Sequence, residues 1–203
     1  MHFENFSPEY LERYRREGDV IIVEITIDSP YDLYDDKDPS ALRARDLKPS
    51  VEDYIATCIR EIPSGQKVRL DFYFYKFSSD QSEAVILEKS VREFFIYKAK
   101  VRLLDFKFKI KNGLKSVFIG LGFLFMCIFI SNSFLSTSNT IFERFFLEGL
   151  SVLGWVSLWN PVQIFLYEIW PIIASSKTLK RCSKVNMSFQ SIDDLPEDRK
   201  YIA

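Results

Sequence analysis

The apolar positions of the chain are concentrated in one long region. Charged residues are frequent over roughly the first 115 positions, residues 117–174 are very apolar, and the remaining positions are polar again. Residues 117–135 carry no charge, and residues 149–174 carry a single one, at Glu168. A helix of about 20 apolar residues can cross the ~30 Å hydrocarbon core of a bilayer. The pattern predicts two transmembrane helices, at 117–135 and 149–174, joined by an external loop at 136–148.

Basic residues flank the apolar region on both sides. They are Lys98, Lys100, Arg102, Lys107, Lys109, Lys111 and Lys115 before it, and Lys177, Lys180, Arg181 and Lys184 after it. The predicted loop holds one basic residue, Arg144. Because positively charged flanks stay in the cytoplasm, both termini are expected there. Residues 96–116 then form a basic juxtamembrane helix, residues 175–203 form a cytoplasmic tail, and the lipid bilayer is the first expected partner.

The polar N-terminal part has the pattern of a small α/β domain. Residues 20–27 are a β-branched run of strand length, and apolar and polar side chains alternate over residues 67–77. Apolar residues between these runs recur at helical spacing, with Ser50 as the expected capping residue. This order predicts a parallel strand pair with a right-handed crossover. Two strands are not stable alone, so residues 185–190 are a candidate third strand.

A second helix is predicted from residue 82 to about residue 114, with Gly113 as the joint to the first span. The fold class is therefore an α+β membrane protein. Its cytoplasmic α/β domain has the order β-α-β-α over residues 1–95, and two transmembrane helices follow. The basic end of the second helix suits either an anionic lipid surface or solvent, and these two interpretations stay open.

Four residues of the second span are candidate functional or packing residues. Pro161 lacks a backbone donor and predicts a kink, and Asn160 beside it can bond to a neighbouring helix. Gln163 and Glu168 are the other polar groups. Glu168 is either an interfacial carboxylate paired with a basic neighbour or, in an oligomer, an ion ligand. We favour the first interpretation, since one carboxylate and two amides are few groups for an ion path.

The segment after the first strand, residues 28–50, is rich in aspartate. Several carboxylates, among them Asp32, could bind a divalent cation, but the spacing and the missing glycine differ from an EF-hand. Asp and Pro residues also make turns and caps, and we favour that interpretation. Arg45 and Asp46 could pin this loop to the sheet through internal bonds.

Two stretches, residues 29–55 and 148–172, resemble a group of uncharacterised bacterial inner-membrane proteins with an N-terminal α/β region and a two-helix hairpin. The resemblance spans roughly residues 20–185, and its most specific part is a W-x-P-x5-Y-x2-W-P pattern formed here by Trp159, Pro161, Tyr167, Trp170 and Pro171. Relatives carry Arg where this chain has Asn160, which weakens an argument from charge there. The resemblance implies a bacterial inner-membrane location and no particular activity.

Composition narrows the function classes. With 27 basic and 28 acidic residues the net charge is -1, which argues against a nucleic-acid partner. Three separated cysteines and a single histidine predict neither a disulfide framework nor a zinc site, and we expect no cofactor. The sequence contains no complete catalytic motif, so we expect that the protein is not an enzyme.

Three functions compete on this evidence. The first is a non-catalytic, membrane-anchored binding or regulatory module that forms a homo-oligomer. Its α/β domain would bind a cytoplasmic protein partner or a small ligand. The second is an oligomeric pore or transport component lined by Asn160, Gln163 and Glu168. The third is a metal-dependent, membrane-bound hydrolase that uses the aspartates.

Overall fold

The computed structural model describes residues 8–41, 45–77, 81–135 and 140–196. Within these ranges the chain forms two compact units. We call the part built from residues 1–99 and 177–203 the α/β unit, and the part built from residues 100–176 the helical unit. Two helices contribute to both units, α2 (Gln81–Leu135) and α5 (Ile169–Cys182).

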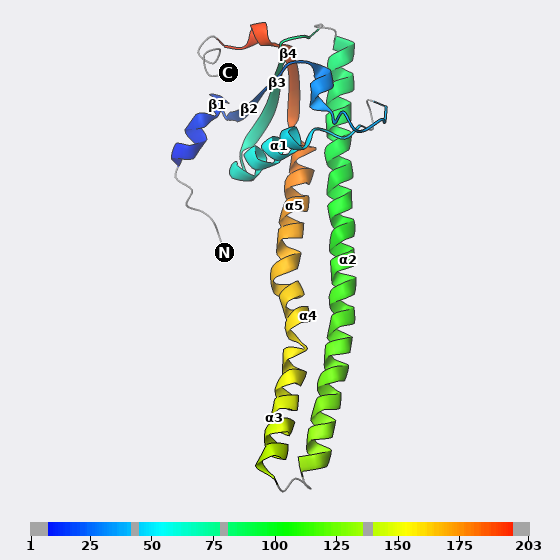
Figure 1. Ribbon diagram of the computed structural model, residues 1–203. Coiled ribbons are helices and arrows are strands. Elements are labelled where there is room, and N and C mark those ends of the chain that lie inside the picture. The colour runs from blue at the N-terminus through cyan, green and yellow to red at the C-terminus, as the bar shows by residue number, and fades with distance from the viewer. Residues whose placement is uncertain (1–7, 42–44, 78–80, 136–139, 197–203) are drawn as a thin grey trace. The chain divides into compact units, whose positions relative to one another are not determined.

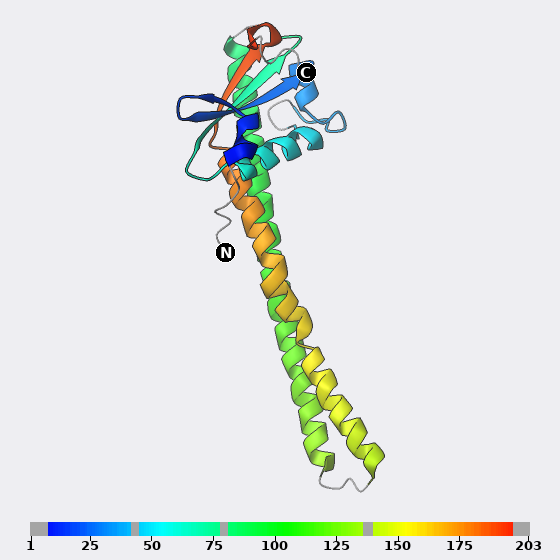
Figure 2. The same ribbon diagram turned by 90° about the vertical axis from the view of Figure 1, so that its left-hand side faces the viewer.

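The α/β unit contains a four-stranded sheet in the order β1-β2-β3-β4 (Figures 1 and 2). The strands are β1 (Arg15–Glu17), β2 (Val20–Ile27), β3 (Lys67–Phe74) and β4 (Asn186–Ser191). β2 pairs in parallel with β3, and β3 pairs in parallel with β4. The predicted parallel pair and the candidate third strand are both confirmed.

β1 is an additional strand that the sequence pattern did not predict. It pairs antiparallel with β2 through a tight turn, in which Gly18 adopts a φ of 58°. Glycine suits this turn because the left-handed region is strained for residues with a Cβ. The sheet therefore has one antiparallel edge strand next to three parallel strands.

Helix α1 (Pro49–Glu61) makes the crossover between β2 and β3. It begins at Pro49, with Lys48 at the N-cap and no side-chain capping bond, so the predicted capping role of Ser50 is wrong. Proline is favoured in the first turn of a helix because its missing N–H would have no helical partner. Three short helical turns complete the unit, at Pro8–Arg13, Pro30–Leu33 and Ile192–Asp194.

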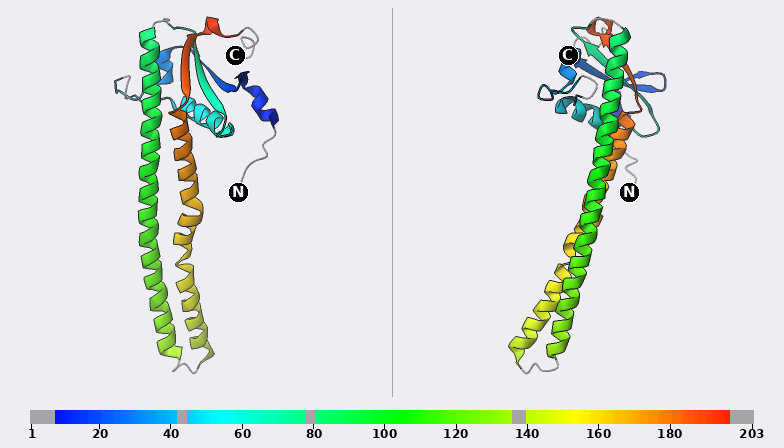
Figure 3. Two further views of the ribbon diagram at one scale, coloured as in Figure 1. Left: turned by 180° about the vertical axis from the view of Figure 1, so that it is seen from behind. Right: turned by 90° about the vertical axis from the view of Figure 1, so that its right-hand side faces the viewer.

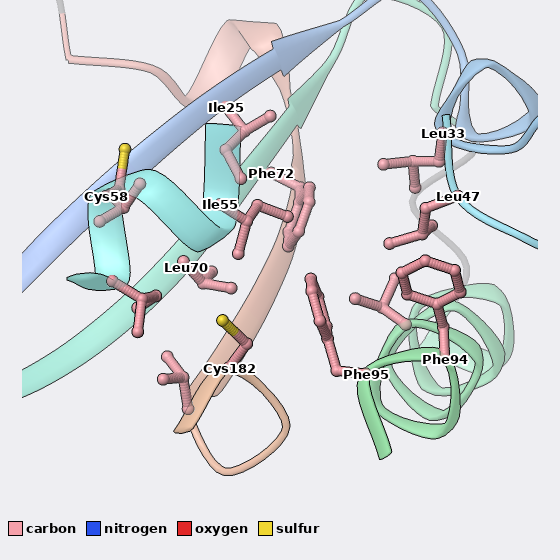
Figure 4. Close-up of a cluster of buried hydrophobic side chains, with 14 of the residues drawn as sticks. Ile25, Leu33, Leu47, Ile55, Cys58, Leu70, Phe72, Phe94, Phe95 and Cys182 are labelled. Atoms are coloured by element: carbon pink, nitrogen blue, oxygen red, sulfur yellow. The ribbon is translucent and has the colours of Figure 1, made fainter. Parts of the chain in front are cut away.

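One face of the sheet, α1 and the first part of α2 enclose the apolar core (Figure 4). Ile55 of α1, Phe95 of α2 and Phe72 of β3 are each completely buried. The Phe72 ring stacks on that of Phe189 in β4, at a centroid distance of 4.8 Å. Cys182, at the end of α5, is also buried in this core. The core thus requires side chains from both ends of the sequence.

The helical unit pairs the later part of α2 with an antiparallel series of shorter helices (Figures 1 and 3). These are α3 (Ile141–Val156), α4 (Trp159–Gln163), the π-helix η3 (Ile164–Glu168) and α5. α2 continues through Gly113, so the predicted joint at that residue is wrong. α3 begins inside the predicted external loop, because Thr140 and Glu143 form a capping box ahead of Gly149.

The stretches Ser82–Ser133 and Ile141–Cys182 are each long and apolar enough to cross a membrane. In the most apolar 18 residues of each stretch, the buried share is only 22% and 17%, respectively. Core helices of soluble proteins hide most of such a surface, so the two stretches have the exposure expected of helices that face lipid.

Candidate functional site in the helical hairpin

Small residues bring α2 close to the opposing helices of the helical unit. A Cβ placed on Gly154 would lie 2.9 Å from a methyl carbon of Leu124, and one on Gly120 would lie 3.0 Å from the Ser157 carbonyl oxygen. Farther along, the Ser131 hydroxyl donates to the Leu147 carbonyl at 3.1 Å. Small side chains and hydroxyl bonds are typical of helix association in membranes, where the hydrophobic effect does not drive helices together.

Pro161 coincides with an interruption of the second apolar segment, as predicted. It cannot donate to the Ser157 carbonyl one turn earlier, and the helix is broken between Val156 and Trp159. The Ser157 hydroxyl donates to the Gly120 carbonyl of α2 at 3.0 Å and to the Gly154 carbonyl at 2.6 Å. The π-helix follows this break directly. The Ser157 carbonyl, to which Pro161 cannot donate, therefore lies where the two helices approach closely, 3.0 Å from a Cβ placed on Gly120.

Asn160 bonds to the neighbouring helix. Its side-chain nitrogen donates to the Ser116 hydroxyl at 3.3 Å, at the start of the charge-free part of α2. This contact agrees with the packing role expected for Asn160. This hydrogen bond to Ser116 needs no charge at position 160.

Glu168 is paired with Lys109 of α2 by a short, charge-assisted hydrogen bond. Both side chains are partly exposed, which suits a pair at the edge of an apolar region. The expectation of a basic neighbour is met, although the partner comes from α2 and not from the residues that follow α5. This pairing neutralises the only charge between residues 149 and 174.

Gln163 lies in a different environment from the other three residues. It is exposed and lines a surface groove of about 720 Å³ together with large apolar side chains. The other lining residues are Trp155, Leu158, Trp159, Val162, Leu166 and Tyr167. Within the described part of the chain, no polar partner of Gln163 is present. Asn160, Gln163 and Glu168 therefore do not line one path within a single copy.

The aspartate-rich loop uses its polar groups internally. Lys48 bonds to Asp32 at 3.4 Å, and the Asp46 amide donates to the Asp38 carboxylate at 2.8 Å. Hydrogen bonds from Ser40, and then from the Asp46 amide, lower the pKa of Asp38 to about 2. Arg45 is half-buried, and its charge lies near Asp38. These contacts match the structural interpretation of the loop.

A metal site at this loop receives no support from the structure. Among the described residues, no group of three or more His, Cys, Asp or Glu side chains is arranged to hold a metal ion. Lys98, on α2, lies 3.9 Å from the Asp46 carboxylate and 3.2 Å from that of Glu52. The loop carboxylates thus have cationic side chains as neighbours.

Sequence reasoning missed an ionic cluster on the sheet face opposite the core. Asp71 is fully buried on the central strand β3 and accepts bonds from Arg69 at 2.7 Å and Arg15 at 3.2 Å. Arg15 also forms an ion pair with Glu24 at 2.8 Å, and Arg69 forms an ion pair with Glu17 at 3.0 Å. The hydrogen bond to Asp71 raises the pKa of Arg69, so its charge is held firmly. The sequence did contain a signal for this cluster, because Arg69 and Asp71 lie two residues apart on one strand and therefore share a face of the sheet.

No protein-family model matches the chain, and no match was found among curated proteins or solved structures.

Proposed function

We propose that this protein is a non-catalytic, membrane-anchored binding module of the bacterial inner membrane, with both termini in the cytoplasm. The helical unit is the anchor and the α/β unit carries the binding surface. The low burial of the two apolar stretches is the observation that carries the proposal. Large side chains such as Phe118, Ile119 and Phe125 are more than 70% exposed, and burying them in lipid removes this apolar surface from water.

The way the two units share helices supports the same proposal. α2 supplies Leu87, Val91 and Phe95 to the core of the α/β unit, and it then continues without interruption into the charge-free apolar stretch. α5 leads back from the helical unit into the α/β unit just before β4. Both ends of the apolar hairpin are thus continuous with the same folded unit, as the cytoplasmic placement of both termini requires.

Membrane topology gives the direct test. The three native cysteines are buried, so a new cysteine at an exposed position can be labelled selectively. We expect an impermeant maleimide to label Arg144→Cys in bacterial spheroplasts and Lys76→Cys only in inverted vesicles. An alkaline carbonate wash should leave the full chain in the membrane. Labelling of both cysteines from the same side, or release by carbonate, would contradict the proposal.

Self-association through the Gln163 groove is part of this proposal. A polar amide surrounded by tryptophan and leucine at the protein surface is costly in lipid unless it finds a hydrogen-bond partner. A second copy of the chain offers the same amide on the same apolar face, as a two-fold interface requires. The groove around Gln163 would then be the contact between copies.

A further inference from the structure

A basic recess in the α/β unit lies where the parallel strands begin. It has a volume of about 400 Å³ and is lined at the starts of β2, β3 and β4 and at the end of α5. Four of the lining residues are basic, namely Lys67, Arg69, Arg181 and Lys184. The other lining residues are Val20, Gln66, Val68, Val185 and Asn186, so none of the described residues that line it is acidic.

The positive charge of this recess is only partly compensated. Arg69 is committed to Asp71 and Glu17. Arg181 donates to four neutral carbonyl oxygens at and just after the end of α1. The bonds are 2.9 Å to Ile59, 2.8 Å to Pro63 and 3.4 Å to Gln66, and the fourth is to Ile62. These carbonyls hold the guanidinium in place without cancelling its charge.

The two lysines have little compensation. Lys184 is exposed and has no side-chain partner within the described ranges. Lys67 approaches Asp19 only at 3.6 Å, and both of these side chains are more than 70% exposed. An exposed pair of this kind contributes little. Arg181, Lys184 and Lys67 thus leave at least two positive charges available to an anion.

From these contacts we infer that the recess binds a phosphate group carried by a larger molecule. The fixed guanidinium of Arg181 contributes positive charge. The two exposed ammonium groups and the neighbouring side-chain amides of Gln66 and Asn186 contribute hydrogen-bond donors for a tetrahedral dianion. The volume exceeds that of a phosphate ion and leaves room for the group to which it is esterified. The inference rests on the proposed function and names the ligand class of the binding module.

The ligand can be a soluble phosphoester or the headgroup of an anionic lipid, and two experimental arms separate these sources. In the first, the full chain in phosphatidylcholine nanodiscs is titrated with inorganic pyrophosphate by calorimetry at low salt. In the second, the chain is moved to nanodiscs that contain phosphatidic acid, and retained lipid is measured by native mass spectrometry. Each arm compares the parent chain with Lys67→Gln/Lys184→Gln and with Lys76→Gln/Lys89→Gln.

The control substitutions remove the same number of charges from exposed or half-exposed lysines outside the recess. Lost charge-assisted bonds should weaken binding about tenfold or more in Lys67→Gln/Lys184→Gln and leave the control pair unchanged. If pyrophosphate binds the parent chain and the control pair but binds Lys67→Gln/Lys184→Gln more weakly, the ligand is a soluble phosphoester. If only Lys67→Gln/Lys184→Gln fails to retain phosphatidic acid, the ligand is a lipid headgroup. The inference is overturned if neither probe binds the parent chain, or if both variants lose binding equally. Carbonate extraction of the same samples separates this failure from a failure of membrane anchoring.

Discussion

At the scale of single residues, Asp71 is the most constrained charge of the α/β unit. It is fully buried between Arg15 and Arg69, and a neutral replacement would leave two partly buried guanidinium groups with fewer acceptors. We expect Asp71→Asn to lower the free energy of unfolding by about 3 kcal/mol. For a chain of this size the melting temperature should fall by roughly 6–12 °C.

The matched control for Asp71→Asn is Asp19→Asn, which removes a carboxylate from an exposed pair. This change should alter stability by less than about 0.5 kcal/mol. Thermal unfolding of both variants in one detergent, followed by circular dichroism, measures the difference. Equal melting temperatures for the two variants would show that the buried cluster does not stabilise the sheet.

Asp38 gives a pH-dependent prediction. Its pKa in the folded chain is about 2, below the ordinary value of about 3.9, so the ionised form stabilises the loop above pH 4. This contribution is lost as the pH falls from about 4 towards 2. Asp38→Ala should therefore melt below the parent chain at pH 7, and the gap should close as the pH falls through that window.

Asp36→Ala is the control for the loop, because the Asp36 side chain is 84% exposed and lies 3.8 Å from Lys48. Asp36→Ala should have the same melting temperature as the parent chain at every pH. A constant gap between Asp38→Ala and the parent chain from pH 7 down to pH 2 would exclude the proposed role of the Asp38 carboxylate.

At the scale of elements, glycine determines how closely the helices of the helical unit approach each other. A Cβ at Gly120 would lie 3.0 Å from both a backbone oxygen of Ser157 and a methyl carbon of Leu158. Gly120→Ala should destabilise the hairpin by about 1–3 kcal/mol, because a backbone atom cannot move aside like a flexible side chain. Unfolding by sodium dodecyl sulfate measures the change.

Gly122 is the control on the same helix, because nothing lies within 4 Å of a Cβ placed there. Gly122→Ala should be neutral, or more stable by up to about 1 kcal/mol, since alanine favours helix. If both alanine variants unfold at the same detergent concentration, close packing at Gly120 is not what holds the hairpin together.

The strands that the sequence pattern predicted are those whose own residues carry the signal. All residues of 20–27 except Glu24 are β-branched, and they form β2 over that same range. β1, by contrast, consists of Arg-Arg-Glu and has no apolar pattern. It is held by antiparallel pairing with β2 and by ion pairs from Arg15 to Glu24 and to Asp71. None of these contacts leaves an apolar pattern in the three residues of β1, so a search for apolar periodicity could not find the strand.

For the helices and the candidate site residues, too, the local sequence predicts only what depends on nearby residues. Glycine at position 113 suggested a joint, yet the helix continues through it. The missing side chain leaves room for the Phe165 ring, because a Cβ there would lie 3.1 Å from that ring. Pro161 produced the expected interruption, since a missing N–H is a local property. Lys109 as the partner of Glu168 was not predictable, because it depends on the register of two helices far apart in sequence.

At the scale of the whole molecule, the Gln163 groove predicts that copies associate. Gln163→Leu should raise the dissociation constant of the dimer in liposomes by about threefold to thirtyfold, the range for interhelical polar contacts in membranes. Energy transfer between labelled copies, diluted with lipid, gives this constant.

Val162→Leu serves as the control for self-association, because Val162 lines the same groove without a polar group. It should leave the dissociation constant close to that of the parent chain. A parent chain that stays monomeric at all protein-to-lipid ratios would remove the groove as a contact between copies.

The split origin of the α/β unit has a consequence for biosynthesis. Arg92 of α2 donates to the Ser183 carbonyl at 2.6 Å, and Arg181 holds the end of α1, so the last third of the polypeptide completes a structure begun by the first third. The ribosome synthesises β4 only after both apolar segments have been made. Under the proposed topology, insertion precedes completion of the sheet. A chain in which only one of the two apolar segments inserted would leave β4 on the opposite side of the bilayer from β3, whose edge would then stay unpaired.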